Sequence, residues 1–171
     1  MIASPRLVDP NFARSVVLMV QHGDEGALGL ILNRPLGTTV REVCEKVLET
    51  DCAIEAFLHQ GGPCEGPLMV LHTDGTGGEV EVMPGVHFTA DRGKIEHLLG
   101  STDDVTAKFF VGYAGWGAGQ LEGELETGSW LTVKAESQQI FDGGDKLWSR
   151  LTTALTAGID PDTIPEDPSM N

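Results

Sequence analysis

The chain has 171 residues, of which 40% are hydrophobic and 22% charged, as expected for one globular domain. It carries 26 acidic and 11 basic residues, so its formal net charge is −15. Because binding to nucleic acid or to an anionic membrane needs a basic surface, this charge argues against both as partners. No apolar run approaches the roughly 20 residues of a membrane helix. The three cysteines show no Cys-x-x-Cys spacing, so we expect reduced thiols and a cytoplasmic location.

The first third of the chain alternates short apolar runs with turn residues. The run 15–21 is too short for a helix and rich in valine, so it predicts a buried strand. Residues 1–3 and 27–32 predict two further strands, with the loop 23–26 closing a hairpin. Thr39 and Glu42 form a capping box, which predicts the start of a helix. Helical spacing then predicts an apolar face made of Val40, Val43, Cys44 and Val47.

The remainder of the chain mixes strands and helices without a regular alternation. Strands are predicted at residues 57–60, 68–72, 80–83, 107–111 and 130–134, and residues 86–89 lead into a helix. Helices are predicted at residues 91–99, 120–126 and 145–156. This mixture predicts an α+β fold in a single domain, residues 1–171, with helices packed around a mixed sheet. The last residues, 159–171, hold three prolines and are expected to form a loosely held arm.

A glycine-rich stretch with two aromatic residues is the most distinctive segment. Residues 112–122 read GYAGWGAGQLE and follow the apolar run KFFV. Because glycine allows positive φ and close backbone approach, the stretch predicts a shaped loop. Two interpretations of Trp116 follow: it is either a binding anchor on this loop or a plug in the core. The segment lacks the Lys-Ser/Thr ending of a phosphate loop, so phosphate binding is disfavoured.

Four polar residues near apolar strands are candidates for chemistry. His22, His59 and His72 lie at or near the ends of predicted strands, and Cys64 lies between His59 and His72 in the sequence. An imidazole beside a thiol activates a nucleophile, and histidines that converge bind metals. The simpler interpretation is that Cys64 is a small buried hydrophobe and that the histidines bond to loop carbonyls. Arg34, at a polar break in the chain, either clamps an anion or pairs internally to order its loop.

The motifs taken together resemble those of the YqgE/AlgH family of bacterial proteins. They occur in order at residues 3–5, 10–17, 26–36, 61–63, 70–72, 112–122, 129–131 and 158–161. The resemblance implies a mixed, bifurcated β-sheet curled into a pseudo-barrel with helices packed around it. It supplies no established catalytic residues. One member of the family is named as a regulator of alginate production and is often labelled a transcriptional regulator.

We therefore expect a non-catalytic binding or regulatory protein that recognises a protein or small-molecule partner without a cofactor or a metal. Its predicted recognition surface comprises Asn33, Arg34, Pro35, Gly61, Gly62, Pro63, Tyr113, Gly115, Trp116, Gly117, Gln120 and Glu122. One alternative is a thiol- or metal-dependent enzyme centred on His59, Cys64 and His72. The other is a direct DNA-binding regulator, which the net charge disfavours.

Overall fold

The fold is organised around one long strand, β9 (Ala107–Gly117), which has neighbours along both edges. The structure, a computed structural model, describes residues 1–45, 54, 56–101 and 105–158. One edge of β9 pairs antiparallel with β6 (Cys64–His72). The other edge pairs first with β5 (Phe57–Gln60), in parallel, and then with β3 (Gly26–Ile31), antiparallel. Because two strands share this edge in succession, the sheet is bifurcated, as the family resemblance implied.

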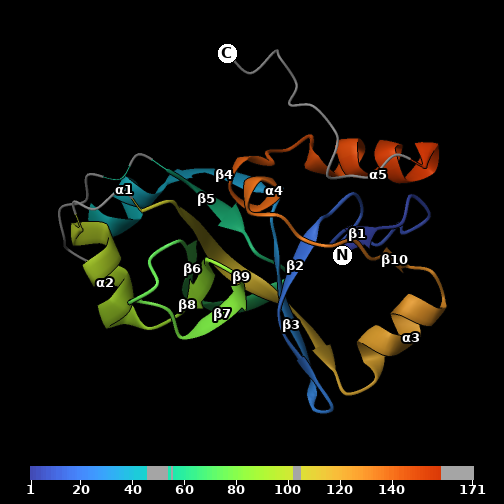
Figure 1. Ribbon diagram of the computed structural model, residues 1–171, viewed down its shortest axis with the longest axis horizontal. Helices are drawn as coiled ribbons and strands as arrows, with labels where there is room; N and C mark the ends of the chain where they lie inside the picture. Colours follow the sequence, from blue (N-terminus) through green and yellow to red (C-terminus); the bar gives the residue numbers. More distant parts are fainter. Residues whose placement is uncertain (46–53, 55, 102–104, 159–171) are drawn as a thin grey trace.

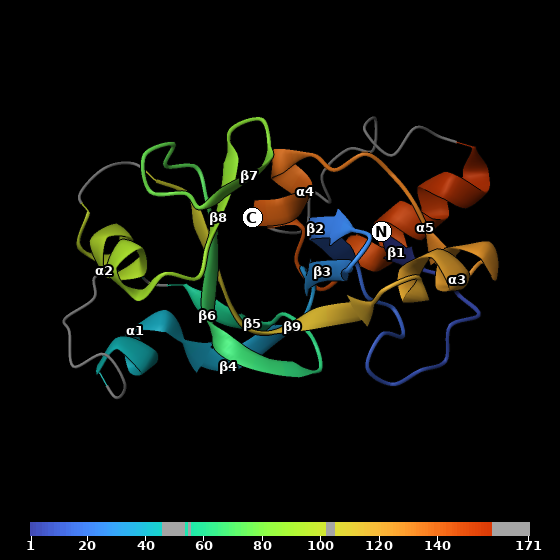
Figure 2. The same ribbon diagram turned by 90° about the horizontal axis from the view of Figure 1, so that it is seen from below.

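The main sheet curls until its two end strands approach each other. Its strand order is β2-β3-β9-β6-β8-β7, where β8 is Val86–Thr89, and β4 (Pro35–Thr39) joins through β5. The end strands β2 (Val17–Gly23) and β7 (Val80–Met83) lie close together but are not paired within the described part of the chain. The sheet is therefore mostly antiparallel and nearly closed into a barrel. Figure 2 shows the short helix α4 (Ser137–Asp142) between β7 and β2.

The helices other than α4 lie at both ends of the curled sheet (Figure 1). At one end are α1 (Val40–Val43) and α2 (Arg92–Gly100). At the other end, α3 (Gln120–Glu126) and α5 (Leu147–Ala157) accompany the small sheet formed by β1 (Ile2–Ala3) and β10 (Trp130–Leu131). These elements form a single α+β domain. Within the described residues, no helix is both long enough and apolar enough to span a membrane.

Most predicted elements are confirmed. The strands predicted at residues 57–60 and 80–83 have those bounds, and the predicted helix 120–126 is α3. Residues 86–89, which were expected only to lead into a helix, form a strand. The capping box is present, with the Thr39 hydroxyl oxygen accepting from the Glu42 N–H and the Glu42 carboxylate accepting from the Thr39 N–H. Cys44 is buried in the core, as its helical spacing predicted. The predictions for Val47 and for the arm 159–171 fall on residues outside the described part.

Three predictions are corrected by the structure. The glycine-rich segment is not a loop up to Gly117 but the second half of β9, since its backbone pairs with β3. The break at Asn33-Arg34-Pro35 leads into β4, which sequence patterning did not predict. The helix α4 was also missed, because its six residues are too few to show an apolar period.

Three apolar clusters fill the fold. The first lies inside the curled sheet and includes Leu30, Leu71 and Phe110. The second packs Phe109 and Val70 against α1 and α2. The third lies beneath α3 and contains both Trp116 and Trp130.

Candidate functional site

The glycines of the predicted recognition surface form the fork of the sheet. Gly61 follows β5, donates its N–H to the Val111 carbonyl at 2.9 Å and accepts from the Ile31 N–H at 2.8 Å, so it bridges β9 and β3. A Cβ atom at Gly62 would overlap the backbone of Tyr113. Gly112 has a φ of +71°, and a Cβ there would lie 2.7 Å from the Cys64 carbonyl oxygen. These glycines are required for close backbone approach, which leaves no room for side chains at the fork.

Asn33 and Arg34 order the loop that precedes β2. The buried Asn33 amide accepts from the Val16 N–H at 2.8 Å and donates to the Arg14 carbonyl at 2.9 Å. The Arg34 guanidinium donates to the Ala13 carbonyl at 3.3 Å and to the Pro10 carbonyl at 3.5 Å. Partial burial lowers the pKa of Arg34, against the opposing effect of Asp9. Of the two interpretations left open for Arg34, the structure thus shows the internal pairing.

Trp116 is packed in the core. Its side chain is 4% exposed, stacks on Phe12 with ring centroids 5.8 Å apart, and meets Trp130 edge-on at 5.9 Å. The indole N–H donates to Glu124 Oε2 at 3.0 Å. Two interpretations were left open for Trp116, a binding anchor or a core plug. Its buried position matches the core plug.

Several members of the predicted surface remain accessible. Pro35, Pro63, Gly117, Gln120 and Glu122 are exposed, and Tyr113 and Gly115 are half-buried. Glu122 Oε1 lies 2.6 Å from Nε2 of His22 on β2, and this hydrogen bond holds the pKa of the Glu122 carboxyl below its usual range. Recognition of a partner by these residues stays a prediction.

The residues of the enzyme alternative do not converge. Cys64 pairs with Tyr113 on β9, His59 with Phe110 and His72 with Ala107, so they follow β9 at intervals of about 10 Å. His59 is on β5, which pairs with one edge of β9, whereas Cys64 and His72 are on β6, which pairs with the other edge. In the described part of the chain, no group of three or more His, Cys, Asp or Glu is placed to hold a metal ion.

The surroundings of the two histidines lower the pKa of both side chains. Burial, aided by the charge of Lys108, lowers the pKa of His59 to about 4, and its ring packs on Phe110 at 5.7 Å. Burial also lowers the pKa of His72, which is fully buried and stacks on His87 at 5.9 Å. The charge of Asp74 opposes the lowering of the pKa at His72.

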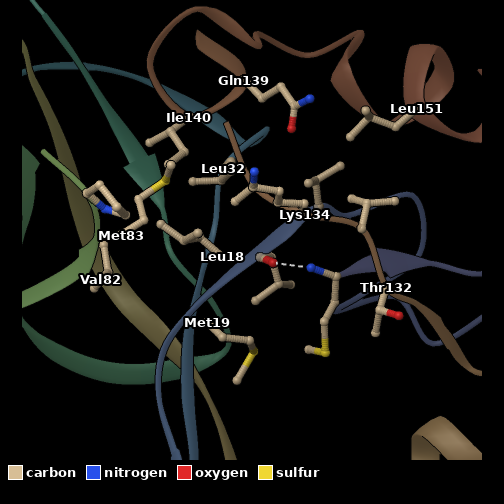
Figure 3. Close-up of a pocket in the computed structure, with 16 residues that line it drawn as sticks. Leu18, Met19, Leu32, Val82, Met83, Thr132, Lys134, Gln139, Ile140 and Leu151 are labelled. Atoms are coloured by element: carbon tan, nitrogen blue, oxygen red, sulfur yellow. Dashed lines mark hydrogen bonds between the residues drawn. The ribbon is translucent and has the colours of Figure 1, made fainter. Parts of the chain in front are cut away.

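A pocket lined mainly by apolar side chains lies at the open seam of the barrel. This seam pocket has a volume of about 380 Å³ and is lined by 16 residues. They come from β2, β7, the segment 132–135, α4 and α5, together with Met1, Val16, Leu32 and Pro84. Thirteen of them are apolar, among them Leu18, Met19, Met83, Ile140 and Leu151 (Figure 3). The other three are Thr132, Lys134 and Gln139. A pocket of this size and character suits a small apolar molecule.

The Met1 amine also borders the seam pocket, where it donates to the Val17 carbonyl at 2.6 Å (the dashed line in Figure 3). Burial lowers the pKa of this amine to about 6. None of the pocket residues belongs to the surface predicted from the sequence. The pocket unites residues far apart in the chain, so no local motif indicates it.

The AlgH-like family model matches residues 1–160 of the chain. The UPF0301 protein CT0663 of Chlorobaculum tepidum is 44% identical over 156 residues, which cover 88% of this chain and 81% of that protein. A UPF0301 protein of Chlorobaculum parvum is 40% identical, and the match covers 100% of this chain and 93% of that protein.

Two solved structures share the fold. The solution structure of the AlgH protein from Pseudomonas aeruginosa superposes with a TM-score of 0.74 at 31% identity, covering 92% of this chain and 86% of that one. The crystal structure of protein DIP2367 from Corynebacterium diphtheriae has a TM-score of 0.67 at 21% identity, covering 88% and 82%, and shows a likeness of fold alone. On the family match and these identities, the chain belongs to the AlgH-like family.

Proposed function

We propose that the protein is a non-catalytic binding protein that holds a small apolar molecule in the seam pocket. The observation that carries this proposal is the cavity of about 380 Å³ between β2 and β7, where the barrel does not close. Ligand pockets in proteins start at about 300 Å³ and are lined mainly by apolar side chains with few polar groups. The seam pocket has both properties.

The polar groups around the seam pocket do not suggest a reaction. Its three polar side chains provide one amine, one amide and one hydroxyl, and no histidine, cysteine or carboxylate lines it. General acid–base and nucleophilic catalysis both need a titratable or activated group beside the substrate. The two amines at the pocket are otherwise placed, since the Met1 amine donates to the Val17 carbonyl and Lys134 is exposed to solvent. We infer that a bound molecule is held and released unchanged, which fits a sensor or carrier.

The experiment is a titration with the neutral apolar dye N-phenyl-1-naphthylamine, whose fluorescence rises in apolar surroundings. We expect saturable binding at one site per chain. Met83→Trp, which fills the pocket from β7, should weaken binding at least about tenfold, the equivalent of about 1.4 kcal/mol. The matched control is Val80→Trp on the same strand, where the side chain is 43% exposed and does not line the pocket.

Thermal unfolding of each variant shows whether it folds, and only folded variants are compared. If Met83→Trp folds but binds the dye as wild type does, the seam pocket is not the site. If the wild type shows no saturable binding, the proposal itself is contradicted.

A protein partner is the other kind of ligand that the sequence suggests. The exposed residues Gln120 and Glu122 project from the start of α3, beside the hairpin that carries His22. We propose them as the part of the predicted surface through which a partner would bind. Charge reversal in Glu122→Lys should then abolish capture of that partner, whereas Glu126→Lys, exposed on the same helix, should not.

A further inference from the structure

We propose that the ligand of the seam pocket is an amphipathic carboxylate, with its hydrocarbon part inside the pocket and its carboxylate bound by Lys134. This inference rests on the function proposed above and names the class of its ligand. It is carried by the distribution of charge around the pocket and by three unused hydrogen-bond donors.

The charge of the pocket differs from that of the whole chain. The chain has 26 acidic residues against 11 basic ones, yet no acidic residue lines the pocket. Lys134 is the one charged side chain among the lining residues, and it is exposed to solvent. It therefore places a positive charge at the boundary between the apolar interior and water. An anion is favoured at that boundary, and a cation is disfavoured.

Two other side chains that can donate hydrogen bonds line the same pocket as Lys134. Lys134, Thr132 and Gln139 all line the pocket, and Figure 3 shows them together with the apolar side chains of Leu32 and Leu151. None of the three side chains makes a hydrogen bond or ion pair with another described residue. Ammonium, amide and hydroxyl groups all donate to carboxylate oxygens, and charge-assisted bonds of this kind are the stronger ones.

The remainder of the pocket suits a hydrocarbon. Leu18, Met83 and Ile140 line it from three different elements, β2, β7 and α4, so that an apolar chain is contacted on several sides. Methionine side chains, here Met19 and Met83, adapt to apolar ligands of irregular shape. A ligand with two charges, or with a polar body, would leave groups unsatisfied against these walls.

The test compares three probes with the same eight-carbon chain and different head groups: octanoate, 1-octanol and octyltrimethylammonium. Each displaces N-phenyl-1-naphthylamine from the wild-type protein at pH 7.5. We expect octanoate to bind at least about fivefold more tightly than 1-octanol, and octyltrimethylammonium to bind most weakly. Raising the salt concentration should weaken the binding of octanoate and leave the binding of 1-octanol unchanged.

Variants at the mouth of the pocket assign the preference to a residue. Lys134→Gln should bring octanoate to the affinity of 1-octanol, and Lys134→Glu should make octyltrimethylammonium the preferred probe. Arg6→Gln removes one exposed positive charge that does not line the pocket and should keep the wild-type preference. Because Lys134 is exposed, these variants are expected to fold, which thermal unfolding verifies.

The failure of this inference is distinct from the failure of the proposed function. If 1-octanol binds as tightly as octanoate, or if the preference survives in Lys134→Gln, the carboxylate ligand is ruled out while the apolar pocket stands. If none of the three probes displaces the dye because the dye itself does not bind, the proposed function fails as well.

Discussion

Trp116 and Trp130 donate their indole N–H groups to one and the same oxygen, Oε2 of Glu124, at 3.0 and 2.7 Å. The two rings meet edge-on, and Gln120 donates to the other oxygen of the same carboxylate at 3.0 Å. Glu124 thus joins the end of β9, the start of β10 and helix α3. A sequence with two tryptophans 14 positions apart gives no sign of this shared acceptor.

Glu124→Ala should lower the free energy of unfolding by about 3 kcal/mol, because two buried indole N–H groups lose their acceptor. Glu126→Ala is the control: this residue is exposed on the same helix, and its loss should change stability by no more than about 0.5 kcal/mol. Urea unfolding of both variants measures the difference. A Glu124→Ala variant as stable as the control would show that the shared acceptor contributes nothing.

Trp116→Ala should cost about 3–5 kcal/mol of unfolding free energy, since it removes a large side chain from the packed cluster beneath α3. Phe57→Ala provides the comparison, because Phe57 is also aromatic but 58% exposed, and this change should cost far less. Chemical denaturation followed by circular dichroism reports both values. Equal losses in the two variants would contradict the core position of Trp116.

Much of the fold could be predicted from local patterns. Short apolar runs between turn residues indicate strands such as β5 and β7, and the Thr39–Glu42 pair indicates a helix start. The glycine-rich half of β9 escaped this reasoning because glycine lowers strand propensity. Its strand conformation is imposed instead by pairing with β3 and β6, which are more than 40 residues away. Long-range pairing is not visible in a local pattern.

The candidate site could be predicted only in part. The sequence indicated that residues 33–35, 61–63 and 112–122 are special, but the reason for several of them is the fork of the sheet and not an exposed contact. Glycine is favoured both where another backbone approaches closely and where a ligand is contacted. The glycine content of a segment therefore does not distinguish these two roles. The seam pocket depends on how β2, β7 and α4 approach one another, and this is a property of the assembled fold.

Gly62→Ala should destabilise the protein severely, by about 3 kcal/mol or more, because the added Cβ overlaps the Tyr113 backbone at the fork. Gly100→Ala is the matched change, since a Cβ at this helical position meets nothing within 4 Å. It should be neutral or stabilise by up to about 1 kcal/mol, the difference in helix propensity. Thermal unfolding of both variants checks this. Similar midpoints for the two variants would mean that the fork accommodates a side chain.

Lys108 gives the protein a predictable dependence of stability on alkaline pH. Its side chain is 5% exposed, and Nζ donates to the Ile140 carbonyl of α4 at 2.9 Å. Burial lowers the pKa of Lys108 from 10.5 to about 8, against the opposing effect of Asp142. Between these two values the unfolded chain holds the proton and the folded protein releases it. Stability therefore rises as the pH increases from about 8 to 10.5, by up to about 3 kcal/mol.

Lys108→Met keeps an unbranched side chain of similar length and removes the titrating amine. Its free energy of unfolding should lack the rise that the wild type shows between pH 8 and 10. Lys134→Met, where the replaced amine is exposed, should retain the wild-type slope. Urea unfolding at pH 7, 8, 9 and 10 under reducing conditions gives the slopes. Parallel curves for wild type and Lys108→Met would show that the lysine inside the barrel keeps its ordinary pKa, and that its contact with α4 carries no cost of burying a charge.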